Sequence, residues 1–164
     1  MVDTAQLLKV CRRAAQAGCR VVRDWQGKAR VWDKGPADLV TQADLASQLE
    51  IESIVLGEYP EHDFLGEESG KSGIDLSPGK ICWIVDPIDG TTNYVHGLPG
   101  YAVSVAVAEG EQVLAGNVLD AMSGEDFWAV RDGGAFLGET KLAGSQVTSL
   151  ERALVAVSLP PRVD

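Results

Sequence analysis

The most informative stretch of the chain is ICWIVDPIDGTTN, residues 81–93. Its first five residues form a continuous apolar run, which predicts a buried β-strand. Pro87 fixes the backbone and removes a hydrogen-bond donor, so the chain must turn directly after Asp86. We therefore expect this strand to deliver Asp86 and Asp89 to one end of a sheet.

An amphipathic helix is predicted at the N-terminus. Asp3 or Thr4 can cap it, Gly27 ends it, and small or apolar residues recur at helical spacing between these points. The predicted buried stripe consists of Leu7, Leu8, Cys11, Ala14, Ala15, Gly18, Val22 and Trp25.

A second helix is predicted after a loop and a short extended piece at residues 34–40. Residues 41–44 (TQAD) form a capping-box pattern, and Gly57 and Pro60 stop the helix. The apolar positions of its period are Leu45, Leu49, Val55 and Leu56.

Short apolar runs follow the second helix and predict strands. Besides the strand at 81–85, they are residues 64–65, the hairpin 101–108 with 113–119, the hairpin 127–130 with 135–137, and a last run at 154–157 that precedes Pro160-Pro161. Helices first and strands afterwards predict an α+β fold, in which two N-terminal helices pack on a largely antiparallel sheet. The length predicts one domain, residues 1–164.

The composition restricts the partners. Lys and Arg total 14, Asp and Glu total 24, and the net charge of −10 argues against non-specific binding to nucleic acid. The longest apolar run, residues 101–108, is far shorter than the roughly 20 residues of a membrane-spanning helix, so no membrane association is expected. Residues 1–4 lack the pattern of a secretory signal, and three cysteines without metal-type spacing predict reduced thiols in a cytoplasmic protein.

The residues after the buried strand indicate a metal-assisted phosphate site. Two carboxylates, Asp86 and Asp89, and the carbonyl of Ile88 form a set of hard oxygen ligands suited to Mg²⁺. Gly90 and Thr91 then offer main-chain N–H groups and a hydroxyl to an anion. An isolated Asp-Pro or Asp-Gly pair would indicate only a turn, but the whole string, with Gly-Glu-Glu at 66–68 upstream, favours a site.

Residues 86–97, DPIDGTTNYVHG, resemble the signature of the inositol monophosphatase family. Residues 34–44, residues 66–69 (GEES) and the strand at Tyr101 resemble that family in the same order. The resemblance implies the first half of a layered αβαβα sandwich and a lithium-sensitive, Mg²⁺-dependent phosphatase. It also implies a small phosphorylated substrate such as inositol 1-phosphate, and a homodimer or a partner that supplies the C-terminal half.

The resemblance further implies a role for each site residue. The implied metal ligands are Glu67, Asp86, the carbonyl of Ile88, and Asp89. Glu67 and Thr91 would orient the attacking water, and Asp44 would hold Thr91 by a hydrogen bond. The substrate phosphate would contact Asp89, Gly90 and Thr91. Helix capping explains Asp44 equally well, and both interpretations stay open at this point.

The sequence also departs from the family. Family chains are longer, and their second half, an α/β layer, contains a Trp-Asp-x-Ala-Ala-Gly motif whose Asp is a further metal ligand. That motif is not present in residues 1–164, so we expect weak or no activity from this chain by itself and exposed apolar surface that favours association.

Two alternative functions remain. One is a non-catalytic metal-binding or interaction module, and the other is a relative of bisphosphate nucleotidases or histidinol phosphatases. Thr92-Asn93 favours an inositol monophosphatase over the second alternative. His62 and His96 are interpreted as surface or loop residues, because a hard-metal oxygen site does not favour imidazole.

Overall fold

The computed structural model describes residues 3–35, 38–69 and 77–156. Residues 36–37 of the predicted loop, Val157 and the pair Pro160-Pro161 lie outside these ranges. In chain order the elements are α1 (Thr4–Trp25), β1 (Val31–Gly35), β2 (Asp38–Thr41), α2 (Gln42–Glu58), β3 (Asp63–Gly66), a 3₁₀ turn η1 (Glu67–Ser69), β4 (Ile81–Asp89), α3 (Thr91–Val95), β5 (Ala102–Glu109), β6 (Gln112–Asp120), β7 (Asp126–Val130), β8 (Gly134–Leu137), β9 (Thr140–Lys141) and a second 3₁₀ turn η2 (Leu150–Arg152).

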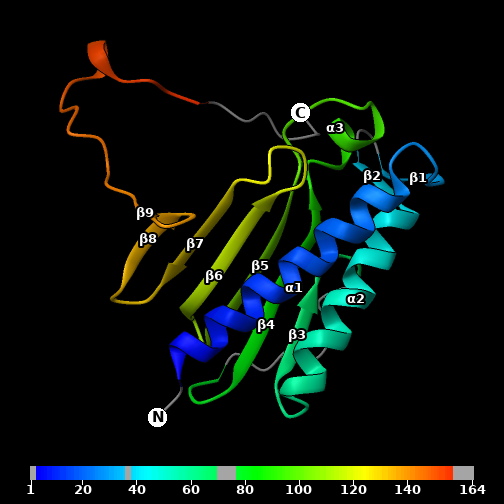
Figure 1. Ribbon diagram of the computed structural model, residues 1–164, viewed down its shortest axis with the longest axis horizontal. Coiled ribbons are helices and arrows are strands. Elements are labelled where there is room, and N and C mark those ends of the chain that lie inside the picture. The colour runs from blue at the N-terminus through cyan, green and yellow to red at the C-terminus, as the bar shows by residue number, and fades with distance from the viewer. Residues whose placement is uncertain (1–2, 36–37, 70–76, 157–164) are drawn as a thin grey trace.

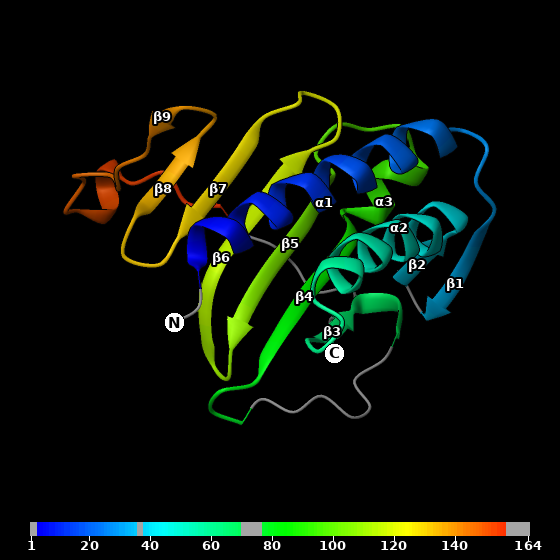
Figure 2. The ribbon, with the colours of Figure 1, turned by 60° about the horizontal axis from the view of Figure 1, so that its bottom comes forward.

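One seven-stranded sheet organises the chain, in the order β3-β4-β5-β6-β7-β8-β9. The helices α1 and α2 lie side by side across one of its faces (Figures 1 and 2). Every neighbouring pair is antiparallel except β3 and β4, which are parallel. The predicted α+β class, with two N-terminal helices on a largely antiparallel sheet, is confirmed.

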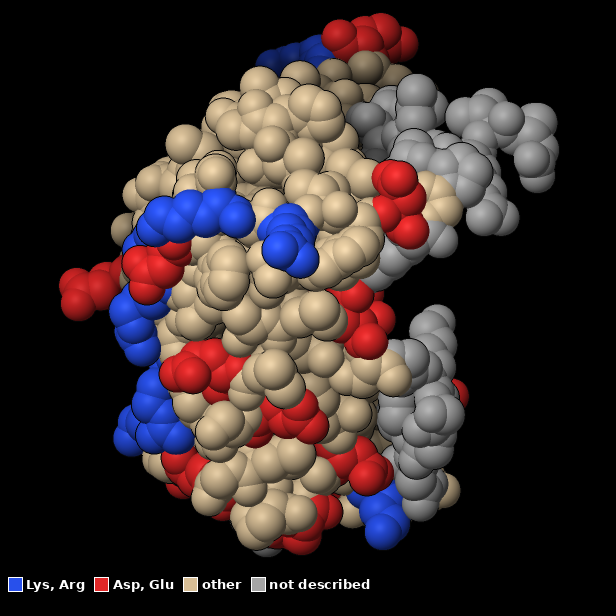
Figure 3. Space-filling model, turned by 90° about the vertical axis from the view of Figure 1, so that its right-hand side faces the viewer, with Lys and Arg blue, Asp and Glu red and all other residues tan. Residues whose placement is uncertain are grey.

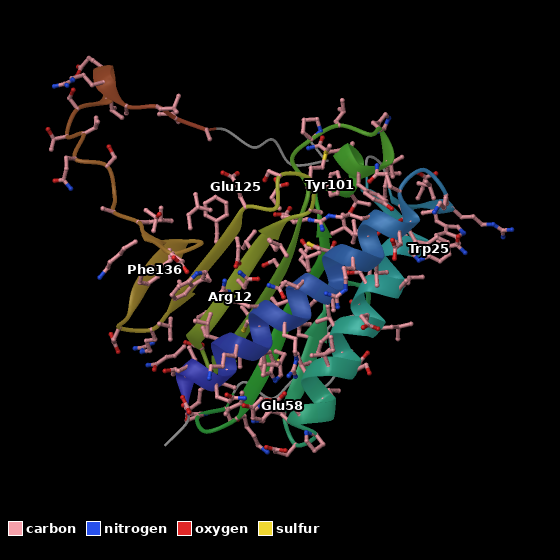
Figure 4. All side chains as sticks on the ribbon, viewed as in Figure 1. Arg12, Trp25, Glu58, Tyr101, Glu125 and Phe136 are labelled. Atoms are coloured by element: carbon pink, nitrogen blue, oxygen red, sulfur yellow. The ribbon has the colours of Figure 1, made fainter. Side chains whose placement is uncertain are left out.

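The first helix follows its prediction closely. The Asp3 side chain caps it by accepting hydrogen bonds from the N–H groups of Ala5 and Gln6, at 3.0 and 3.2 Å. Gly27 lies just past its end with φ +69°, a conformation that glycine adopts without strain. The sheet-facing side is also linked by polar contacts, since Arg12 reaches from α1 to Asp126 on β7 (Figure 4).

The second helix has the predicted capping box but buries a different face. Leu45 and Leu49, two of the predicted core positions, are 43% and 64% exposed. The buried face instead carries Asp44, Ser47 and Gln48 in its first turns, followed by apolar Ile51 and Val55. The prediction was therefore wrong for Leu45 and Leu49, whereas Val55 is buried as predicted. In the first turns, polar side chains take the buried positions because they hydrogen-bond to neighbouring segments.

Several strands differ in extent from their predictions. Where a loop and a short extended piece were predicted at residues 34–40, the structure has the antiparallel pair β1 and β2. β4 continues beyond the predicted end at Val85 to Asp89. The hairpins β5–β6 and β7–β8 agree with the sequence, whereas residues 154–156 of the last apolar run form no strand.

The face of the sheet opposite the helices is apolar and open. Ile84, Val118 and Phe127 are each partly exposed on it, and a groove of about 430 Å³ runs over β5, β6 and β7. Leaving β9, the chain runs away from the sheet, with the Leu154 side chain fully exposed (Figure 1). This agrees with the expected exposed apolar surface.

Two further findings concern membrane-spanning helices and the cysteines. No helix within the described ranges combines the length and apolar character needed to cross a bilayer. Cys11, Cys19 and Cys82 are all buried free thiols.

Candidate metal and phosphate site

The parallel pairing of β3 and β4 brings two carboxylates together. Gly66 at the end of β3 is paired with Val85 of β4, so the residues that follow them, Glu67 after β3 and Asp86 within β4, come side by side. Both line a cleft of about 370 Å³ together with Leu65, Ile84, Val85, Ser104 and Ala106. The predicted neighbourhood of Glu67 and Asp86 is thus present in the fold.

Asp86 lies at the centre of the acidic cluster. Burial, together with the neighbouring carboxylates of Glu67 and Asp89, raises its pKa to about 7. The N–H of Ile88 donates to Asp86 Oδ1 at 3.1 Å, which favours the ionised form but does not offset the other effects. Acidic side chains also spread over the lower part of the face in Figure 3, whereas several basic ones lie along its left edge.

Asp86 and Asp89 both lie in β4, on either side of an irregularity in its pairing. The pairing of β4 with β5 is interrupted between Asp86 and Asp89. Directly afterwards, Gly90 has φ +92° and caps α3. A Cβ there would lie 2.7 Å from the carbonyl oxygen of Gly100, so only glycine fits. Gly90 therefore allows Asp89 and the first turn of α3 to approach Asp86.

Thr91 connects α3 with α2 and with the loop. Its hydroxyl lies 3.2 Å from Asp44 Oδ1 and 2.9 Å from the carbonyl oxygen of Ile88, and can donate to either. Asp44 Oδ2 at the same time accepts from the N–H and the hydroxyl of Thr41, at 2.8 and 2.6 Å. The carboxylate thus makes the cap contact and the Thr91 contact together, so the two interpretations of Asp44 are compatible.

Burial and hydrogen bonding act in opposite directions on the pKa of Asp44, which is raised overall. Burial raises its pKa, and the hydrogen bonds from Thr41 and Thr91 counteract the rise. A carboxylate placed there has its oxygens oriented by three donors, which fixes the side chain in one conformation.

Sequence reasoning missed two polar residues that contact this site. Ser47 donates from its hydroxyl to the carbonyl oxygen of Pro87 at 3.2 Å. Gln48 bonds to both Glu68 and Ser69, which flank the site in the turn η1. The available signal was the helical spacing of Asp44, Ser47 and Gln48, which places all three on one face.

The remaining candidates have structural contacts. Asn93 Nδ2 donates to the carbonyl oxygen of Gly100 at 2.9 Å, and His96 is exposed after α3. His62 lies in the loop before β3, as predicted, but its ring is largely buried. It stacks on Tyr59 with ring centres 4.6 Å apart, and its Nδ1 accepts a 3.1 Å hydrogen bond from Trp83.

The donor set fits a hard divalent cation. Carboxylates and a main-chain carbonyl are the ligands that Mg²⁺ favours, and a cation would offset the mutual repulsion of Glu67, Asp86 and Asp89. Within residues 3–35, 38–69 and 77–156, however, no three His, Cys, Asp or Glu side chains are placed so that together they could hold a metal ion. One oxygen of Asp86 is instead directed to the N–H of Ile88. The assigned ligand and catalytic roles remain predictions.

Comparison with known proteins identifies the group to which this chain belongs. The model of the inositol monophosphatase family matches residues 3–163. The fructose-1,6-bisphosphatase/inositol-1-monophosphatase of Aquifex aeolicus is 32% identical over 99% of this chain and 61% of its own length. The inositol-1-monophosphatase of Caulobacter vibrioides is 35% identical over 94% of this chain and 60% of its own length.

A solved structure shows the same likeness in three dimensions. The extragenic suppressor protein SuhB from Bartonella henselae superposes with a TM-score of 0.78 and 35% identity, over 87% of this chain and 55% of that one. The chain thus spans about three fifths of the length of the curated relatives described here. Together with the fold and the order of its motifs, these matches show that the chain belongs to the inositol monophosphatase family, a family of phosphatases.

Proposed function

We propose that this chain carries a Mg²⁺-dependent phosphomonoesterase site for inositol 1-phosphate or a similar sugar-like phosphate. The observation that supports it most is the meeting of Glu67 and Asp86 where the parallel pairing of β3 and β4 ends, with Asp89 close enough to raise the pKa of Asp86. Membership of a metal-dependent phosphatase family supports the same conclusion.

The proposed ligands of Mg²⁺ are Glu67, Asp86, the Ile88 carbonyl and Asp89. Mg²⁺ held there would activate water and neutralise charge on the phosphate. Residues 89–91 are proposed to contact the phosphate, since the first N–H groups of a helical turn need acceptors outside the helix.

Thr91 and Glu67 are the proposed groups that orient the attacking water. When the Thr91 hydroxyl donates its hydrogen to Asp44, the lone pairs of its oxygen are left to accept a hydrogen bond from water. The Glu67 carboxylate is a second acceptor. Water held between two acceptors presents a lone pair to the phosphorus, which is the positional requirement for an in-line attack.

Calorimetric titration of the 164-residue chain with Mg²⁺ tests the metal site, and phosphate release from inositol 1-phosphate tests the reaction. We expect Mg²⁺ binding that Asp89→Asn weakens about 10-fold or more. Asp132→Asn is the matched control, because it makes the same change in charge at an exposed turn between β7 and β8. Absence of Mg²⁺ binding to the wild-type chain, or equal weakening by both variants, would contradict the proposal.

Turnover separates the phosphatase from the non-catalytic metal-binding module. We propose that the 164-residue chain hydrolyses its substrate slowly, because it spans about three fifths of its relatives and the family resemblance places a further ligand in their second half. Slow release that a chelator abolishes supports the phosphatase. Mg²⁺ binding with no release at all supports the non-catalytic module instead, and release at the rate of a full-length relative contradicts the expected impairment.

Compartment and assembly are part of the same proposal. The buried free thiols are compatible with a reducing cytoplasm. The open apolar face of the sheet is compatible with a homodimer or with a partner that supplies a C-terminal half. Lithium inhibition is proposed from the family resemblance alone.

A further inference from the structure

Three buried polar side chains lie on one face of α2. Asp44, Ser47 and Gln48 are 1%, 0% and 5% exposed. Their spacing of three and four residues places them together at the N-terminal end of the helix, which begins beside β2 and runs back along β4 (Figure 2). Burial of polar groups is unfavourable unless each is hydrogen-bonded, so their partners explain why this face is polar.

Each of the three residues bonds to a different segment of the candidate site. Asp44 accepts from Thr91 at the start of α3, and Ser47 donates to the carbonyl of Pro87 in β4. Gln48 bonds to the turn η1 that follows β3. The first turns of α2 therefore link three segments of the candidate site, which are spread over the sequence from Glu68 to Thr91.

Gln48 contacts the chain on both sides of Glu67. Its Oε1 accepts from the N–H of Glu68 at 3.0 Å, and its Nε2 donates to the hydroxyl of Ser69 at 2.7 Å. On the other side, a Cβ on Gly66 would lie only 2.1 Å from Gln48 Oε1. Glycine at 66 therefore leaves the space that the Gln48 amide occupies.

We propose that Gln48 is a positioning residue that fixes the main chain at Glu67 and so holds the Glu67 carboxylate beside Asp86. The inference rests on the proposed function, because it concerns a ligand of the proposed metal. Residues that orient metal ligands, without touching the metal, commonly change metal affinity about 10–100-fold when they are replaced. Gln48 acts here through the N–H of Glu68 and the hydroxyl of Ser69, the two residues that follow Glu67.

The test compares Gln48→Met with the wild-type chain. Methionine keeps the length and apolar stem of the side chain but removes both the donor and the acceptor of the amide. We expect Mg²⁺ affinity, measured by calorimetry, to fall about 10–100-fold. Amide hydrogen exchange should rise several-fold at Glu68 and stay unchanged in β5 and β6.

Ile51→Val is the matched control, because Ile51 is fully buried one turn further along the same face and its apolar side chain can neither bind a metal nor hydrogen-bond to η1. It should lower the thermal midpoint without changing Mg²⁺ affinity.

The outcomes separate this inference from the proposed function. If the wild-type chain binds no Mg²⁺, the proposed function fails. If the wild-type chain binds Mg²⁺ and Gln48→Met binds it equally well, only the positioning role of Gln48 fails. An equal loss of affinity in Ile51→Val would also overturn it, because the effect would then follow from general destabilisation.

Discussion

Substitution of Asp44 tests whether one buried carboxylate supports both the start of α2 and the hydroxyl of Thr91. Asp44→Ala removes the acceptor of three hydrogen bonds, two from Thr41 and one from Thr91. Asp44→Asn keeps one acceptor oxygen and replaces the other with an NH₂ donor. That oxygen can still accept from Thr41, while the NH₂ group faces the Thr91 oxygen and directs its hydrogen to the Ile88 carbonyl.

The two variants should differ in stability. For Asp44→Ala, the loss of the cap costs about 1 kcal/mol, and a buried Thr41 N–H without its acceptor costs a further 1–3 kcal/mol. Relief of the buried charge offsets part of this, since burial raises the pKa of Asp44. We expect a net loss of about 2–3 kcal/mol, or roughly 4–12 °C in the thermal midpoint. Asp44→Asn should lose less than Asp44→Ala, about 1 kcal/mol, because the Thr41 N–H keeps its acceptor.

Chemical unfolding at several pH values measures these differences. The raised pKa of Asp44 means that its contribution to wild-type stability is full below 3.8 and declines as the pH rises through the folded-state pKa. Asp44→Asn lacks this decline, so its stability relative to wild type should improve as the pH rises from 4. Glu50→Gln, an exposed carboxylate on the same helix, is the control and should show neither effect.

Activity then separates the two contacts of Asp44. In Asp44→Asn, the Thr91 oxygen accepts from the new NH₂ group and is less able to accept from water, so Mg²⁺-dependent phosphate release should fall on the order of 10²-fold. Equal destabilisation by Asn and Ala would refute the assignment of the cap to one carboxylate oxygen. Full activity in Asp44→Asn would refute the role assigned to the Thr91 contact.

Three further predictions concern pH and packing. Because the pKa of Asp86 is raised to about 7, protons compete with Mg²⁺, and calorimetric affinity should fall about tenfold per pH unit below 7; a flat profile from pH 5 to 7 would contradict this. Burial lowers the pKa of His62 from 6.5, so the unfolded chain takes up the proton first and stability declines as the pH falls below 6.5. His62→Gln should remove that decline from the urea midpoint; an unchanged pH profile would contradict it. Gly18→Ala places a Cβ 2.8 Å from Ile51 Cδ1 and should lower the free energy of unfolding by about 1–2 kcal/mol. Gly57→Ala has open space at its Cβ position and should raise the free energy of unfolding by about 0.5–1 kcal/mol. Equal thermal midpoints for the two variants would refute the packing argument.

The sequence predicted those parts of the fold whose signals are local. The cap at Asp3, the apolar stripe of α1 and the turn at residues 109–111 each depend on neighbours a few positions away, and all were confirmed. The continuation of β4 to Asp89 was not predicted, because Pro87 usually ends a strand. The interruption in pairing with β5 at that point lets the chain pass Pro87 without losing its direction.

The residues of the acidic motif were predicted more completely than the strand pairing that brings them together. Gly66-Glu67 and residues 86–91 are each contiguous, so the sequence alone shows which carboxylates and main-chain groups each segment offers. Their meeting required the parallel pairing of β3 with β4, which a strand of four residues does not specify. The family resemblance, and not the local pattern, supplied the expectation that Glu67 and Asp86 share one site.

The second helix shows why polar residues that support a site are difficult to predict. Its leucines follow a helical period, and a hydrophobic pattern normally marks the buried face. In this helix the criterion failed, because Asp44, Ser47 and Gln48 are buried against loops whose own N–H, carbonyl and hydroxyl groups require partners. Irregular loops at a site cannot satisfy these groups among themselves as a helix or a sheet does. A helix that supports such loops must therefore present polar side chains inward, so a buried face that departs from the apolar period is itself a signal of an adjacent functional site.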